Sequence, residues 1–119
     1  MPPHSNQQVE IALARMRFHV CVGVLPHERE LPQPLEVDLT VHWQPTGDAV
    51  LDYRELYAAT SDTLATGPLL YLEAIAESLA ARALAMDGVS WCRVAVRKPH
   101  VMLGGPLLHA QVAVERTRA

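Results

Sequence analysis

Alternating apolar and polar residues predict four β-strands in this chain. Over residues 16–24 every second residue is apolar, which is the two-residue period of a strand with one buried face. The same alternation runs through residues 35–43 without a break and returns at residues 108–115, and residues 89–98 have a strand-like composition. A charged, Pro-rich segment over residues 25–34 joins the first two strands and is predicted to be a loop.

Between the second and third strands the period changes to that of an α-helix. The residues that recur at helical spacing in the first predicted helix are Tyr53, Leu56, Tyr57, Thr60 and Leu64. Asp52 stands before them as an N-cap, and Gly67 and Pro68 end this helix. The apolar stripe of the second predicted helix is Leu72, Ile75, Ala76, Leu79, Ala83 and Met86. Asp87 and Gly88 end the second helix.

The element order is β-β-α-α-β-β, which predicts an α+β fold: a four-stranded antiparallel sheet with both helices on one face and a polar second face. With 119 residues there is room for one core, so residues 9–119 are predicted to form a single domain after a disordered tail at residues 1–8. An open sheet leaves unpaired edges. The long, regular strands at 35–43 and 108–115 therefore favour a homo-oligomer that pairs edges between subunits. A monomer with charged, twisted edges is the alternative.

Charge and composition exclude several classes of partner. A net charge of −3 and an isoelectric point near 6.0 give no general attraction for nucleic acid or an acidic membrane surface. The amino terminus lacks an apolar signal core, and Glu73 and Glu77 interrupt the most apolar stretch, so no membrane span is expected. Cys21 and Cys92 lack CxxC spacing, which predicts reduced thiols in a cytoplasmic protein. The histidines form no HxH or HxxxH pair, so no metal site is expected.

Lys98 is the one lysine among ten basic residues, and it ends a predicted strand directly before Pro99. An ammonium group can lose its proton when burial lowers its pKa, whereas a guanidinium stays charged throughout the working pH range. Lys98 is therefore a candidate acid or base. The alternative is a solvated lysine at the end of a strand.

Three further residues have both a structural and a functional interpretation. Glu73 begins the second predicted helix within an apolar stretch, where it either stabilises the helix dipole or binds a planar, guanidine-like edge through its two oxygens. Glu28 lies in the charged loop, where it is either a solvated neighbour of Glu30 or part of a site. Tyr53 fits the buried stripe of the first helix, which favours an aromatic core residue.

Taken together, these residues resemble dihydroneopterin aldolases. The string VGVLPHERELPQPLEVDL over residues 22–39 contains the glycine, the Glu-Arg pair, the glutamine and the Val-Asp strand of that family's opening pattern. Asp-Tyr at 52–53, LEAIAE at 72–77 and Lys-Pro at 98–99 follow in the family's order. The resemblance covers nearly the whole chain, from residue 11 to residue 116, and its motifs fall on the element types that the periodicity predicts.

The resemblance implies a tunnelling fold, in which subunits join their sheets into an oligomeric barrel, a tetramer or octamer, with active sites at subunit boundaries. It implies retro-aldol cleavage of 7,8-dihydroneopterin, a pterin, to 6-hydroxymethyl-7,8-dihydropterin and glycolaldehyde. Glu73 would anchor the pterin with help from the backbone of Leu72. Lys98 would donate and accept protons with a bound water. Glu28 would bind and polarise the site, and Tyr53 would contact the pterin across a subunit boundary.

No cofactor is expected, because the C=N group of the dihydropterin can itself accept the electrons of the broken bond. The chain departs from the family pattern at Val22, where a histidine is common, and over residues 44–50 and 100–105. Two alternatives follow from these departures: a 2′-epimerase of dihydroneopterin or its triphosphate, or a non-catalytic pterin-binding oligomer. The arginines that such an epimerase could use for the triphosphate are Arg29, Arg54 and Arg97.

Overall fold

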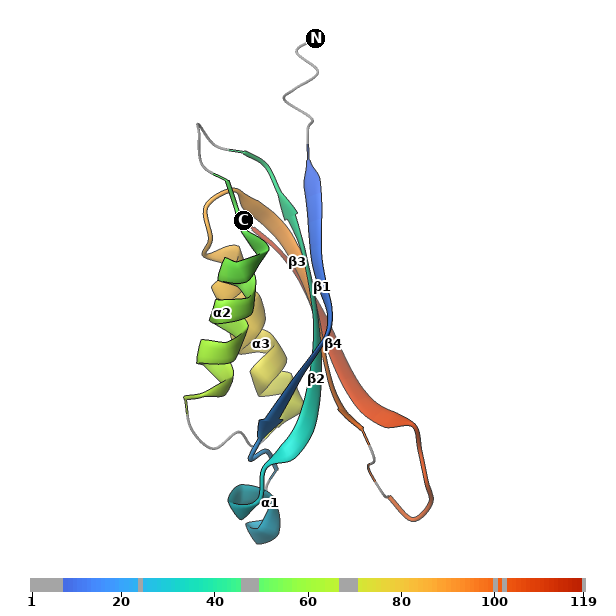
Figure 1. Ribbon diagram of the computed structural model, residues 1–119. Helices are drawn as coiled ribbons and strands as arrows, with labels where there is room; N and C mark the ends of the chain where they lie inside the picture. Colours follow the sequence, from blue (N-terminus) through green and yellow to red (C-terminus); the bar gives the residue numbers. More distant parts are fainter. Residues whose placement is uncertain are drawn as a thin grey trace.

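Four antiparallel strands form one sheet in this computed structural model, which describes residues 8–23, 25–45, 50–66, 71–99, 101 and 103–118. The strands are β1 (Val9–Val20), β2 (Gln33–Trp43), β3 (Val89–Pro99) and β4 (His109–Thr117), and they lie side by side in chain order (Figure 1). The predicted α+β order is confirmed, with one short helix added between β1 and β2. Residues 1–7 of the predicted tail lie outside the described residues.

Two helices, α2 (Tyr53–Leu64) and α3 (Leu72–Leu84), cover one face of the sheet (Figure 1). Asp52 caps α2 as predicted, because its Oδ1 accepts a hydrogen bond from the backbone N–H of Arg54 at 2.8 Å. The predicted ends at Gly67 and Pro68 lie outside the described residues; α2 ends at Leu64. None of the helices in the described part of the chain is long and apolar enough to cross a membrane.

The core lies between the sheet and these two helices. Alternate residues of β2 are buried on the helix side: Leu35, Val37, Leu39, Val41 and Trp43. The residues of α3 that meet the core are Ile75, Ala76, Leu79, Ala80 and Ala83. Each large apolar side chain removed from water stabilises the fold by about 1.5–3 kcal/mol. This apolar layer fixes the register of the sheet, because a slip of one residue would expose it.

β1 begins seven residues earlier than predicted, at Val9, and ends at Val20. The register shows why the alternation did not reveal its first half. Leu13 pairs with Leu39 and Met16 pairs with Val37, so β1 advances three residues while β2 advances two. This bulge reverses the alternation of β1. A two-residue period counted from Met16 therefore fails on the other side of the bulge.

The segment predicted as a loop contains the five-residue helix α1 (Pro26–Glu30). Pro26 occupies its first turn, where a missing N–H costs nothing. Five residues are too few to produce a helical period, so the pattern did not reveal this helix.

The edges of the sheet are β1 and β4, and β2 is an interior strand. The expectation that residues 35–43 offer a free edge is therefore wrong, because β2 pairs with β1 on one side and with β3 on the other.

Candidate active site

Lys98 and Glu28 form an ion pair at the carboxyl-terminal end of β3. The Lys98 Nζ donates a hydrogen bond to Glu28 Oε2 at 2.9 Å, and the two side chains are 18% and 16% exposed. An ammonium group has three N–H donors, and in the described residues only this one has a protein acceptor. The interpretation of Glu28 as a solvated neighbour of Glu30 does not fit this contact.

The loop before α1 holds the Glu28 carboxylate in place. Its other oxygen, Oε1, accepts a hydrogen bond from the backbone N–H of Leu25 at 3.1 Å. Gly23 has φ +130°, and a Cβ at that position would lie 2.2 Å from Glu28 Oε1. Gln33 ties the same loop to β2 through a hydrogen bond from Nε2 to the carbonyl of Val22 at 3.0 Å. Only glycine fits at residue 23, a role that the sequence alone did not reveal.

The pair also fixes the charge of Glu28. The hydrogen bond from Lys98, followed by that from the Leu25 N–H, holds the pKa of Glu28 below its ordinary value of 4.5. Glu28 is therefore a carboxylate at neutral pH. The site presents a negatively charged acceptor beside an amine whose other donors can face a substrate or water.

Glu73 and Leu72 form the first turn of α3. The start of α3, helix α1 and the end of β3 all lie toward the same end of the molecule (Figure 1). The Glu73 side chain is exposed and has no hydrogen bond or ion pair within the described residues, whereas Leu72 is half-buried. The structure thus brings the element that carries Glu73 to the end that holds Lys98, and it leaves the Glu73 carboxylate open to solvent.

Tyr53 lies elsewhere. It is the first residue of α2, and that end of the helix points toward the opposite end of the molecule from α1 (Figure 1). A helix of 12 residues is about 18 Å long, so one subunit does not bring Tyr53 to Lys98. The Tyr53 side chain is 61% exposed, and Tyr57 is 48% exposed. The prediction that Tyr53 belongs to a buried stripe is therefore wrong for the single chain.

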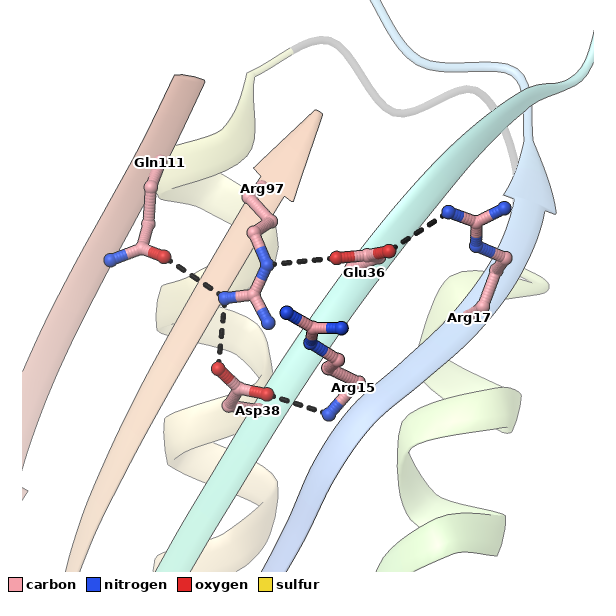
Figure 2. Close-up of polar contacts among 6 residues, drawn as sticks. All are labelled: Arg15, Arg17, Glu36, Asp38, Arg97 and Gln111. Atoms are coloured by element: carbon pink, nitrogen blue, oxygen red, sulfur yellow. Dashed lines mark hydrogen bonds and ion pairs between the residues drawn. The ribbon is translucent and has the colours of Figure 1, made fainter. Parts of the chain in front are cut away.

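Two of the three arginines considered for a triphosphate, Arg97 and Arg54, have other partners than the Lys98 site within one subunit. Arg97 precedes Lys98 on β3, so its side chain lies on the opposite face of the sheet, where it binds Glu36, Asp38 and Gln111 (Figure 2). Arg54 forms an ion pair with Asp52, in which Arg54 Nη2 lies 2.7 Å from Asp52 Oδ2. The side chain of Arg29 lies outside the described part of the structure.

No group of three or more His, Cys, Asp or Glu side chains is placed to hold a metal ion among the residues that the structure describes. Cys92 is buried, and burial raises the pKa of its thiol. Cys21 is half-buried.

Solved structures of similar fold include dihydroneopterin aldolases. The enzyme from Burkholderia thailendensis bound to guanine is 20% identical, with a TM-score of 0.80 over 99% of this chain and 98% of that chain. A putative dihydroneopterin aldolase from Vibrio cholerae is 24% identical, with a TM-score of 0.80 over 92% and 98%. The E. coli enzyme in complex with neopterin is 19% identical, with a TM-score of 0.80 over 91% and 98%.

A search of curated protein sequences found no match. The family model for FolB, dihydroneopterin aldolase, matches residues 11–116. This match includes every element of the sheet except the first two residues of β1 and the last of β4, as well as all three helices. The chain therefore belongs to the FolB family, the dihydroneopterin aldolases.

Proposed function

We propose that this protein cleaves 7,8-dihydroneopterin by a retro-aldol reaction to 6-hydroxymethyl-7,8-dihydropterin and glycolaldehyde, in the cytoplasmic pathway to folate. The observation that carries the proposal is the half-buried contact between Lys98 and Glu28 at 2.9 Å, which places a titratable amine beside a carboxylate. Membership of the FolB family supports the reaction type. The neopterin and guanine held by proteins of similar fold support a flat, nitrogen-rich substrate.

The reaction needs protons moved at three atoms: the 2′-hydroxyl oxygen, N5 and C1′. Loss of the proton from the 2′-hydroxyl turns that C–O bond into the carbonyl of glycolaldehyde, and the bond between C1′ and C2′ breaks. Its electron pair forms a double bond between C1′ and C6, the π electrons of C6=N5 move to N5, and N5 gains a proton. A second transfer then moves a proton from N5 to C1′, which completes the hydroxymethyl group. In this proposal Lys98, working with a bound water, supplies and removes these protons, and Glu28 keeps the amine oriented through their hydrogen bond.

Glu73 is suited to hold the pterin ring. A carboxylate with two free oxygens can accept hydrogen bonds from the 2-amino group and an adjacent ring N–H in one plane. The first turn of α3 also leaves backbone N–H groups without partners in the helix, so the backbone near Leu72 can complete the recognition. Exposure of the Glu73 side chain in the single chain is consistent with this role.

Tyr53 comes from a second subunit in this proposal. The free edges of β1 and β4 offer unpaired backbone groups, and pairing them between copies builds a barrel of four subunits, alone or stacked as an octamer. Such a ring can bring the start of α2 in one copy to the Lys98 end of the next. The exposed Tyr53 ring then contacts the pterin and assists proton transfer.

The proposal is tested by incubating the purified protein with 7,8-dihydroneopterin and assaying glycolaldehyde. Lys98→Ala, which removes the acid and base, is expected to lower kcat by about 10²- to 10⁴-fold. Glu73→Ala is expected to raise KM. Glu30→Gln is the control for Glu28→Gln, because both lie on α1 and Glu30 is exposed. Full turnover in Lys98→Ala would refute the mechanism. Accumulation of the 2′ epimer without glycolaldehyde would identify an epimerase instead.

A further inference from the structure

The face of the sheet opposite the helices carries a row of polar side chains across all four strands. Arg17 on β1 pairs with Glu36 on β2, Glu36 pairs with Arg97 on β3, and Arg97 pairs with Gln111 on β4. Figure 2 shows these side chains converging around Arg97. This row belongs to a different face from Lys98, so the proposed catalytic site makes no use of it.

The two carboxylates of this region are already neutralised. Arg97 donates to Glu36 Oε1 at 3.0 Å and to Asp38 Oδ2 at 2.8 Å, and Arg17 donates to Glu36 Oε2 at 2.9 Å. These bonds hold the pKa of Glu36 low, through Arg17 first, and the pKa of Asp38 low, through Arg97 first. Two cations therefore balance two anions. A further arginine on this face leaves an excess of positive charge unless another carboxylate pairs with it.

Arg15 and Arg93 are those further arginines. The Arg15 guanidinium has no hydrogen bond or ion pair among the described residues, and Arg93 Nε lies 3.6 Å from Glu115 in a loose pair. Both line a hollow of about 740 Å³ on this face, together with Arg17, Arg97, Glu36 and Asp38. Four guanidinium groups thus line the hollow with two carboxylates, in a chain whose net charge is −3. Glu115, outside the lining, is the loose counter-ion of Arg93, so Arg15 is the arginine of the hollow whose guanidinium is left without an acidic partner among the described residues. Small residues, Ala12 and Ala14, leave the space open.

The backbone of Arg15 is also unusual. It is the one non-glycine residue with a positive φ in the described chain, at +55°, within the bulge of β1. Its N–H donates to Asp38 Oδ1 at 2.7 Å, and its side chain reaches over β2 beside Glu36 and Asp38 (Figure 2). Glycine or asparagine would adopt this conformation at less cost, so the turn alone does not call for an arginine. Strained positions of this kind collect at ligand sites.

We infer that this hollow binds a small polyanion that carries a di- or triphosphate group, held between Arg15 and Arg93. Guanidinium groups present paired N–H donors that match phosphate oxygens, and charge-assisted bonds of this kind are among the strongest in proteins. The hollow is open to solvent, and its volume has room for a diphosphate or a nucleotide. The negative net charge of the whole chain disfavours the long phosphate backbone of a nucleic acid.

The test is isothermal titration calorimetry, which measures the affinity of the whole chain for inorganic pyrophosphate at low ionic strength. Arg15→Gln and Arg93→Gln are each expected to weaken binding by about tenfold or more, because each removes a charged hydrogen-bond partner. Two matched variants keep the hollow intact. Arg54→Gln removes an arginine elsewhere, and Lys98→Ala removes the cation of the other face; both are expected to bind within about twofold of the parent.

Circular dichroism and the subunit count establish that each variant is folded. If Arg15→Gln does not fold, Arg93→Gln decides the question. The inference is overturned if the parent fails to bind millimolar pyrophosphate, if both hollow variants bind as the parent does, or if Lys98→Ala abolishes binding. A parallel titration with ADP distinguishes a nucleotide from an inorganic phosphate as the ligand of the hollow. Tighter binding of ADP than of pyrophosphate indicates a nucleotide, and equal or weaker binding indicates an inorganic phosphate.

Discussion

The ion pair between Lys98 and Glu28 joins two residues that lie 70 positions apart in the sequence. Three features of the loop cooperate to place the Glu28 carboxylate: the Leu25 N–H that it accepts from, the space left by Gly23, and the short helix α1. The ammonium group of Lys98 then needs no other protein acceptor to be oriented. Proton transfer in the proposed reaction depends on the hydrogen bond between Lys98 and Glu28.

Lys98→Met is expected to raise the pKa of Glu28 toward 4.5, because the hydrogen bond from Lys98 is the largest cause of its lowering. The folded-state pKa lies below the unfolded value. The pair therefore stabilises the fold above about pH 4.5, and this contribution is lost as the pH falls through the folded-state pKa. An NMR titration of the Glu28 side-chain carboxyl carbon measures the shift. An unchanged pKa in Lys98→Met would contradict the contact, and Arg54→Gln controls for loss of a distant charge.

Gly23→Ala is expected to displace the Glu28 carboxylate, because the new Cβ would lie 2.2 Å from Oε1 at a backbone φ of +130°. The strain is expected to lower the unfolding free energy measured in urea by about 1–3 kcal/mol. Glycolaldehyde release is expected to fall, because a displaced Glu28 no longer orients the Lys98 amine. Gly105→Ala is the matched control, since nothing lies within 4 Å of its Cβ position. Parent-like stability and activity in Gly23→Ala would show that the loop has room to adjust.

At this scale the sequence was informative where chemistry is local. The single lysine and the N-cap Asp52 are visible in the residues themselves, and the structure confirms the cap. The contact between Lys98 and Glu28 and the role of Gly23 depend on distances between segments that no pattern records. The prediction that Tyr53 is buried was wrong because helical spacing shows which residues share a face of the helix. It does not show whether another element of the same chain covers that face.

Elements with a uniform pattern were predicted closely, and elements with a local irregularity were not. β2 alternates without interruption, and its predicted and observed ranges agree to within two residues. β1 contains a bulge that reverses its alternation, and α1 is shorter than two helical turns. Both irregularities position residues of the two proposed sites, because Arg15 lies in the bulge and reaches over the open face, and α1 carries Glu28 to Lys98.

Asp52→Ala is expected to lower the unfolding free energy by about 1 kcal/mol, because the start of α2 loses its side-chain cap. Urea unfolding followed by circular dichroism measures the change. Asp62→Ala is the control, since Asp62 is an exposed residue within the same helix and caps nothing. Equal losses of stability in the two variants would show that the cap contributes little.

The whole molecule separates the residues of the proposed site. The end of β3, which carries Lys98, helix α1, which carries Glu28, and the start of α3 lie toward one end (Figure 1). The start of α2, which carries Tyr53, lies toward the other end. A single subunit therefore carries the two halves of the proposed site at opposite ends, too far apart to act on one substrate molecule. The free edges of β1 and β4 supply a physical route by which copies can join and bring unlike halves together.

Pairing of edges between subunits stays a prediction, but one of the two free edges was predicted on the wrong strand. It placed a free edge at residues 35–43, which form the interior strand β2. Strand order depends on which apolar faces pack together, and a pattern of alternation is the same for an edge strand and an interior one. The subunit count depends on the angle between paired edges, which no local pattern encodes.

Mixing two inactive variants tests the central claim most directly. Lys98→Ala and Tyr53→Ala each damage one half of every site, so each alone is expected to release little glycolaldehyde from 7,8-dihydroneopterin. Dissociated and reassembled together, they are expected to recover up to about one quarter of the parent activity, because random pairing restores that share of two-subunit sites. A double variant, Lys98→Ala with Tyr53→Ala, mixed with the parent controls for assembly. Glycolaldehyde release that stays at the level of the separate variants, from mixed oligomers shown to form, would contradict the account.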